Sequence, residues 1–207
     1  MAPLPYLKET ASQTAGPYVH IGLIPDMAGF DIYERNFGAA LVGPDTPGER
    51  IAIVGRVFDG AGAPVYDALL EIWQADAAGR YPTRADGPHE SGGTRFRGWG
   101  RAGSDFNTGL YAFQTIKPGP VALAGGGGAA PHINFWIVSR GINIGLNTRM
   151  YFSDEQSANA ADPVLGMIEQ ERRRETLIGR RTERDGKTIY LFDIRLQGAE
   201  ETVFFDV

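Results

Sequence analysis

The chain of 207 residues has 28 glycines and 13 prolines, about one residue in five. This lies above the globular average of about 12%, yet below the roughly 25–30% of low-complexity, disordered chains. A net charge of −5 argues against a nucleic-acid-binding protein, because such proteins carry a basic excess to neutralise phosphates. The sequence has no cysteine, which excludes disulfides, thiolate metal sites and a cysteine nucleophile.

The N-terminal residues have no basic stretch followed by an apolar one, so no signal peptide is expected. No run approaches 18 apolar residues, so no membrane span is expected either. The 43% hydrophobic content is enough for a sizeable core. We therefore expect a soluble, cytoplasmic globular protein.

Residues 1–50 are rich in turn signals and poor in periodicity. Gly16-Pro17, Pro25-Asp26 and Gly43-Pro44-Asp45 are typical of loops. We predict that this segment is an extended N-terminal arm with loops, making pocket and partner contacts, and that residues 51–207 form a single domain.

From Ile51 onward the chain shows short apolar runs separated by Gly/Pro turns. Strands are predicted at 51–58, 65–75, 110–116, 133–139, 148–152, 188–196 and 202–205. Many short strands with few helices between them favour an antiparallel arrangement over a βαβ fold. The predicted fold class is therefore all-β, an antiparallel β-sandwich with one or two short helices.

One helix is predicted near 162–172. Asp162 is a suitable N-cap, Pro163 suits the first helical position, and Val164, Leu165 and Ile168 form an apolar edge. The charge-dense stretch that follows, 171–185, is interpreted as a solvated surface.

The segment Pro131-His132-Ile133-Asn134-Phe135 is the part of the sequence most informative about metal binding. Residues i and i+2 of a strand point to the same face, so the side chains of His132 and Asn134 should be neighbours. A His-x-His pair there would offer two imidazoles, whereas an asparagine amide oxygen is a poor ligand for a transition metal. Taken alone, His132 is interpreted as a hydrogen-bonded interior histidine. The glycine run 125–128 is interpreted as a flexible loop, because no Gly-Lys-Ser/Thr follows it.

Several motifs together resemble the intradiol ring-cleaving dioxygenases. In chain order these are Gly55-Arg-Val-Phe-Asp-Gly60, Glu71-Ile-Trp-Gln-Ala-Asp76, Gly79-Arg80-Tyr81, Thr115-Ile-Lys-Pro-Gly-Pro120 and Pro131-His132-Ile133. Three further motifs resemble the α chains of the two-chain enzymes in this family: Thr14–Gly22, Ser139–Ile144 and Glu201–Phe205. The resemblance covers essentially the whole chain.

The resemblance implies a non-haem ferric iron that catalytic chains of the family hold with two tyrosines and two histidines. Matched by motif, Tyr81 and His132 are present, whereas Val121 and Asn134 replace a tyrosine and a histidine. Two of four ligands are therefore missing, so we predict that this chain binds no metal by itself. The Fe(III) would be held by a β-chain partner in an αβ hetero-oligomer.

The resemblance also implies that the α-chain arm lines the substrate pocket around the β-chain iron. The matching residues are Thr14, Gly16, Pro17 and Tyr18. Arg140 matches an arginine near the pocket mouth and would attract an aromatic acid substrate. No catalytic residue is expected in this chain alone. Two simpler interpretations stay open: the arm only joins subunits, and Arg140 only makes an ordinary ion pair.

Two other functions also stay open. One is a self-sufficient intradiol dioxygenase with an altered iron site, which a purple-red phenolate-to-iron absorption band from this chain alone would support. The other is a transthyretin-like β-sandwich that only binds or scaffolds. A neighbouring open reading frame carrying both tyrosines and the His-x-His pair would separate the α-chain interpretation from both.

Overall fold

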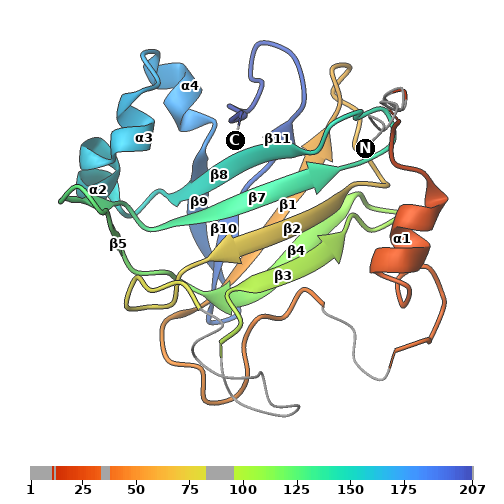
Figure 1. The fold of residues 1–207 in the computed structure, drawn as a ribbon, viewed down its shortest axis with the longest axis horizontal. Helices are drawn as coiled ribbons and strands as arrows, with labels where there is room; N and C mark the ends of the chain where they lie inside the picture. The colour runs from red at the N-terminus through yellow and green to blue at the C-terminus, as the bar shows by residue number, and fades with distance from the viewer. Residues whose placement is uncertain (1–10, 12, 34–37, 83–95, 207) are drawn as a thin grey trace, which may run out of the picture.

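The computed structural model describes residues 11, 13–33, 38–82 and 96–206, and most of the predicted strands are present in it. The strands are β1 (Arg50–Phe58), β2 (Leu69–Gln74), β3 (Trp99–Gly103), β4 (Leu110–Ile116), β5 (Val121–Ala122), β6 (Gly128–Ala129), β7 (His132–Val138), β8 (Leu146–Phe152), β9 (Ile178–Arg184), β10 (Lys187–Leu191) and β11 (Ile194–Arg195). The helices are α1 (Pro17–Leu23), α2 (Gln156–Ala161), α3 (Pro163–Gly166) and α4 (Glu171–Glu175). The predicted all-β class is confirmed (Figure 1).

Among the described residues, nine strands form one mixed sheet that bends into two facing layers, β4-β1-β10-β9 and β3-β2-β7-β8, with β11 beside β1. Strands β5 and β6 form a separate two-stranded sheet. The layers are joined by a short pairing of β8 with β9 (Figure 1). Three pairings are parallel, β1 with β10, β1 with β11 and β8 with β9, and so depart from the expected antiparallel pattern. The chain between β8 and β9 carries α2, α3 and α4, which supplies the long crossover that a parallel pair needs.

Aromatic side chains join the two layers across the core. Phe135 of β7 packs against Tyr111, Phe113 and Phe192, with ring centroids between 5.4 and 6.2 Å apart. All four rings are buried. Phe135 comes from one layer and Tyr111 and Phe113 from the other, so these contacts close the sandwich.

The predicted helix near 162–172 is only partly right. Asp162 does cap α3, accepting hydrogen bonds from the backbone N–H groups of Val164 and Leu165 at 2.9 Å each. However, α3 ends at Gly166, a poor helix former, and a separate helix, α4, begins at Glu171. The region therefore holds short helical turns.

The charged residues of 171–185 are exposed or half-buried, as expected of a solvated surface, but the stretch also contains strand β9, which lies between β8 and β10. One other prediction differs from the structure. The predicted strand at 202–205 makes only an isolated bridge, between Asn147 and Phe205.

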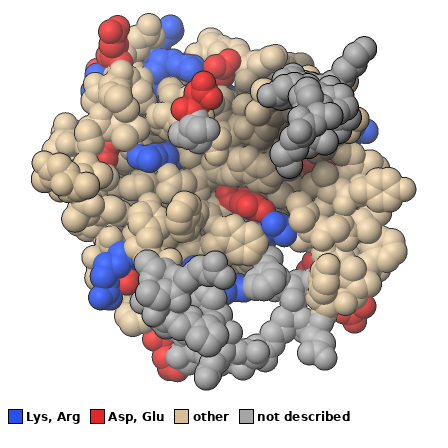
Figure 2. Space-filling model, in the orientation of Figure 1, with Lys and Arg blue, Asp and Glu red and all other residues tan. Residues whose placement is uncertain are grey.

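No helix in the described ranges is long and apolar enough to cross a membrane. Helix α1 lies on the opposite side of the molecule from α2, α3 and α4 (Figure 1). Figure 2 shows that the face above β2, β3 and β7 is mostly uncharged, whereas charged side chains gather most densely over α3 and α4.

Candidate functional site

In the described part of the segment predicted as an extended arm, helix α1 begins at Pro17, directly after Gly16. Gly16 has φ −128° and ψ −174° and acts as the N-cap of α1, and Pro17 occupies the first turn. Proline suits this position because its fixed φ matches a helix and its missing N–H needs no partner there. The prediction of an extended backbone at Pro17 and Tyr18 is therefore wrong, since both belong to a helix.

Thr14 fastens the arm to the loop that carries Arg140. Its hydroxyl donates to the carbonyl of Ser139 at 3.2 Å and accepts from the N–H of Gly141 at 2.7 Å. Two motifs that are 125 residues apart in the chain are thus held together. The structure brings Thr14, Gly16, Pro17 and Arg140 to one place.

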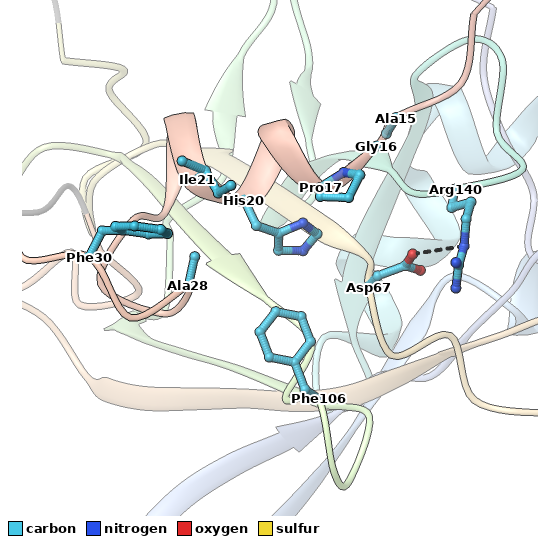
Figure 3. Close-up of a pocket in the computed structure, with 10 residues that line it drawn as sticks. All are labelled: Ala15, Gly16, Pro17, His20, Ile21, Ala28, Phe30, Asp67, Phe106 and Arg140. Atoms are coloured by element: carbon cyan, nitrogen blue, oxygen red, sulfur yellow. Dashed lines mark ion pairs between the residues drawn. The ribbon is translucent and has the colours of Figure 1, made fainter.

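Beside this attachment lies a cavity of about 370 Å³, the arm cavity, between α1 and the body of the sandwich. Apolar groups line most of it, with Ile21, Phe30 and Phe106 as its largest apolar side chains (Figure 3). At one end Arg140 forms an ion pair with Asp67, with 3.3 Å between Nε and Oδ2. Gly16 also lines the arm cavity, but Thr14 and Tyr18 do not. Tyr18 as a whole is 84% exposed, on the surface of α1.

His20 is the polar group at the centre of the arm cavity (Figure 3). The residue is only 7% exposed, and its ring centroid lies 5.5 Å from that of Phe106. Its Nε2 has no hydrogen-bond partner among the described residues. Desolvation by burial lowers the pKa of His20, and the nearby charge of Asp67 partly offsets this. The neutral imidazole therefore offers an unused hydrogen-bonding atom to a group entering the cavity.

Three of the four residues matched to iron ligands also meet, on the outer face of β7. The phenol oxygen of Tyr81 lies 3.2 Å from His132 Nε2 and 3.2 Å from Asn134 Nδ2. We call Tyr81, His132 and Asn134 the former ligand cluster. Gly79 allows the turn that places Tyr81 there: its φ is +76°, and a Cβ would overlap the Pro120 carbonyl.

Hydrogen bonds run through the former ligand cluster in one consistent direction. The His132 Nδ1–H donates to the Ala130 carbonyl at 2.7 Å, so Nε2 is left as an acceptor for the Tyr81 hydroxyl. The Asn134 amide in turn donates to the Tyr81 oxygen and to the Trp73 carbonyl, each at 3.2 Å. Burial, with a smaller effect of the Arg149 charge, lowers the pKa of His132. The neutral ring that this assignment requires is therefore favoured.

These residues do not fit a ferric ion. Only one phenol and one imidazole are present, and the lone pair of His132 that would bind a metal already accepts a hydrogen bond. Val121 lies in β5 and contributes no donor atom from its side chain. Nowhere in the described part of the chain do three or more His, Cys, Asp or Glu side chains group so as to hold a metal.

His20, Phe106 and Asp67 were missed by the sequence analysis. Pro17 and His20 are three residues apart, so an N1 proline followed by a helix would have put both on one face and Tyr18 on another. The contributions of Phe106 and Asp67 depend on tertiary packing, for which the sequence carries no local signal. His89, the remaining histidine, lies outside the described residues.

Comparison with known proteins supports the resemblance to dioxygenases independently of the motifs. Residues 36–198 match a family model described as "Dioxygenase". The chain is 51% identical to the protocatechuate 3,4-dioxygenase alpha chain of Pseudomonas putida, over 99% of both chains. It is 44% identical to the corresponding alpha chain of Burkholderia cepacia, over 97% of this chain and 98% of that one.

Two more distant similarities are informative about pairing and fold. The protocatechuate 3,4-dioxygenase beta chain of Burkholderia cepacia is 38% identical over 75% of this chain and 67% of its own length. Among solved structures, the dioxygenase domain of a carbohydrate-binding fusion protein from Streptomyces sp. SirexAA-E superposes with a TM-score of 0.55 at 23% identity, covering 82% of this chain and 95% of that domain. At that identity the superposition shows a shared fold.

Proposed function

The chain belongs to the intradiol dioxygenase family, and on that premise we propose that it is the α chain of a protocatechuate 3,4-dioxygenase acting in the cytoplasm. In the proposed reaction O2 opens the ring of protocatechuate between its two hydroxylated carbons and gives 3-carboxy-cis,cis-muconate, a step of aromatic catabolism. The observation that carries the proposal is the 51% identity with an alpha chain over 99% of both sequences.

We propose that the iron of the complex is held by a β-chain partner. The support is chemical, because the former ligand cluster has too few donors and uses its imidazole lone pair internally. The β chain of Burkholderia cepacia resembles this chain over two thirds of its own length, which is consistent with two related sandwiches in one complex.

The partner surface we propose lies around α1. Five large apolar side chains between residues 18 and 33 are at least 38% exposed: Tyr18, Leu23, Phe30, Ile32 and Tyr33. Such a concentration in a short segment marks a binding surface better than scattered apolar residues do. We therefore assign residues 1–50 to partner and pocket contacts.

This chain would shape the substrate pocket from its side of the interface. Gly16 and Pro17 supply an apolar wall where α1 begins, and the guanidinium of Arg140 suits a carboxylate. The hydrogen bonds from Thr14 to the Arg140 loop would set the distance between this apolar wall and the guanidinium. Tyr18, exposed on the opposite side of the helix start, presents an aromatic face to the β chain or its bound substrate.

Co-expression with a β chain tests this proposal. We expect an αβ complex with about one iron per pair and protocatechuate-dependent O2 uptake, through an interface above about 2,000 Å². Expressed alone, this chain should self-associate through the surface around α1, and should lack colour. Stoichiometric iron with phenolate colour in the chain alone would overturn the proposal. A stable monomer that forms no complex with the β chain would overturn it too.

A further inference from the structure

Arg149 lies directly opposite Asn134 across the antiparallel pairing of β7 and β8. In such a pair, the Cβ atoms of opposite residues lie about 4.5–5.5 Å apart and their side chains share a face. The same register sets His132 opposite Tyr151. Arg149 therefore stands on the face that carries the former ligand cluster, beside the residue that replaces a histidine of the family.

The charge of Arg149 reaches this cluster. It acts on His132 and on the hydroxyl of Tyr151, to which Arg149 also lies within hydrogen-bonding reach. The guanidinium carbon sits 5.9 Å from the ring centroid of Phe205, so this side chain rests over an aromatic surface. No ion pair between described residues involves Arg149.

The negative charge of Asp162 also acts on His132. Its carboxylate is already occupied by the N–H groups of Ala130, Val164 and Leu165 and by the hydroxyl of Tyr151. The acid therefore stabilises the start of α3, and at His132 its negative charge opposes the positive charge of Arg149.

We propose that Arg149 is a third determinant of metal exclusion in this chain, independent of the missing ligands at positions 121 and 134. Its guanidinium places a fixed positive charge on the face where a metal cation would have to bind. At an effective dielectric constant of about 20, a like charge about 6 Å away weakens binding by on the order of 100-fold for each unit of charge on the ion. Restoring a ligand without removing this charge should therefore fail to restore a site.

The test introduces one histidine and then changes only the charge. N134H would place two imidazoles at i and i+2 beside the phenol of Tyr81, three ligands that suit Zn²⁺ with water as the fourth. The full chain is prepared as N134H, N134H/R149Q and N134H/R149K, and circular dichroism checks that each is folded. N134H/R149M is a second neutral variant in case the glutamine protein does not fold. Calorimetric titration with Zn²⁺ near neutral pH then gives the affinity and stoichiometry.

We expect N134H/R149Q to bind one Zn²⁺ at least about 100-fold more tightly than N134H or N134H/R149K. Adding H132A to the glutamine variant should abolish this binding, which assigns it to the face of β7. Equal affinities of N134H and N134H/R149Q would overturn the proposal, as would a lysine variant that binds as well as the glutamine variant. Absence of Zn²⁺ binding by the folded neutral variants would overturn it too. No β chain is needed, so this result is separate from that of the co-expression test.

Discussion

The arm cavity and the former ligand cluster differ in how their polar atoms are satisfied. In the cluster, Tyr81, His132 and Asn134 hydrogen-bond to one another and to backbone carbonyls. In the arm cavity, by contrast, His20 Nε2 is buried without a described partner, and the nearby Tyr18 is 84% exposed. A buried polar atom without a partner costs free energy, so it marks a place where a second molecule is expected. The cluster, whose bonds are complete within the chain, needs none.

This comparison predicts that substitutions at the cluster change stability and leave turnover intact. Substitutions near the arm cavity should lower turnover and leave stability nearly unchanged. The experiments below use the αβ complex at fixed protein concentration, because association shifts apparent stability. They are ordered by expected free-energy effect.

The largest effect is expected beneath the cluster, at Asp162. Its buried carboxylate caps α3 and accepts the N–H of Ala130 and the hydroxyl of Tyr151. Asp162→Ala should lower the free energy of unfolding by about 3 kcal/mol, from the lost cap and the donors left unsatisfied. Urea denaturation measures this loss. Glu171→Ala, in the first turn of the exposed helix α4, is the control and should change stability by under about 0.5 kcal/mol. An unchanged Asp162→Ala protein would contradict the role given to this network.

Tyr18→Ala should act on turnover. Loss of an aromatic wall permits small misplacements of the substrate, which can lower kcat/KM by up to about 100-fold. Tyr18→Phe separates the ring from its hydroxyl and should retain most activity if the ring is what matters. Met167→Ala is the matched control, because Met167 is 71% exposed and lies in the helical region on the other side of the molecule. Wild-type steady-state kinetics for Tyr18→Ala in an intact complex would remove Tyr18 from the pocket.

Arg140→Ala should lower kcat/KM by about tenfold at low ionic strength and by less at high salt, as expected of a charge that attracts an anionic substrate. Arg140→Lys keeps the charge and should recover much of the loss. Because the Arg140 side chain is 79% exposed, its ion pair with Asp67 contributes little to stability. Kinetics that do not depend on salt, or an equal loss in the lysine variant, would count against a steering role.

Local signals in the sequence predicted a large part of the fold. Short apolar runs bounded by Gly/Pro turns located β1, β4, β7 and β8 to within two residues, because strand-forming residues and turn residues are local signals. The Asp162-Pro163 pair correctly marked a helix start, since capping chemistry is local. Strand β3 was missed because Trp99–Gly103 contains two glycines beside polar and small residues and has little strand propensity.

Residues of the site were predicted where their proximity depends on spacing within one strand. They were missed where it depends on how two strands pair. His132 and Asn134 share a face because they are two residues apart. Arg149 stands beside them only because β8 pairs with β7 at that register, which a single sequence does not determine. The parallel pairing of β9 with β8 likewise depends on the crossover through α2–α4.

The smallest effect is expected for Tyr81→Phe, which removes one hydroxyl from the former ligand cluster. The imidazole of His132 and the amide of Asn134 would each lose a hydrogen-bond partner, so the free energy of unfolding should fall by about 1 kcal/mol. Iron per αβ pair and kcat/KM should stay unchanged, because the ion belongs to the partner in our proposal. Lost iron or activity in this variant would contradict the contrast between the two regions.

The same cluster should make stability depend on pH. Burial lowers the pKa of His132 below its ordinary value of 6.5, so the unfolded chain takes up a proton more readily than the folded one. The stability contributed by the neutral ring is fully present above pH 6.5 and is lost as the pH falls from 6.5 toward the lowered value. Unfolding free energies measured across this window should therefore decrease toward acid.

His132→Gln, which cannot titrate, should be less stable, but its unfolding free energy should depend less on pH. His20 also has a lowered pKa, so His20→Gln is the companion that separates the two contributions. If only His20→Gln flattens the dependence of the unfolding free energy on pH, protonation of His132 is not opposed in the folded chain. The direction of hydrogen bonding assigned to the cluster would then be wrong.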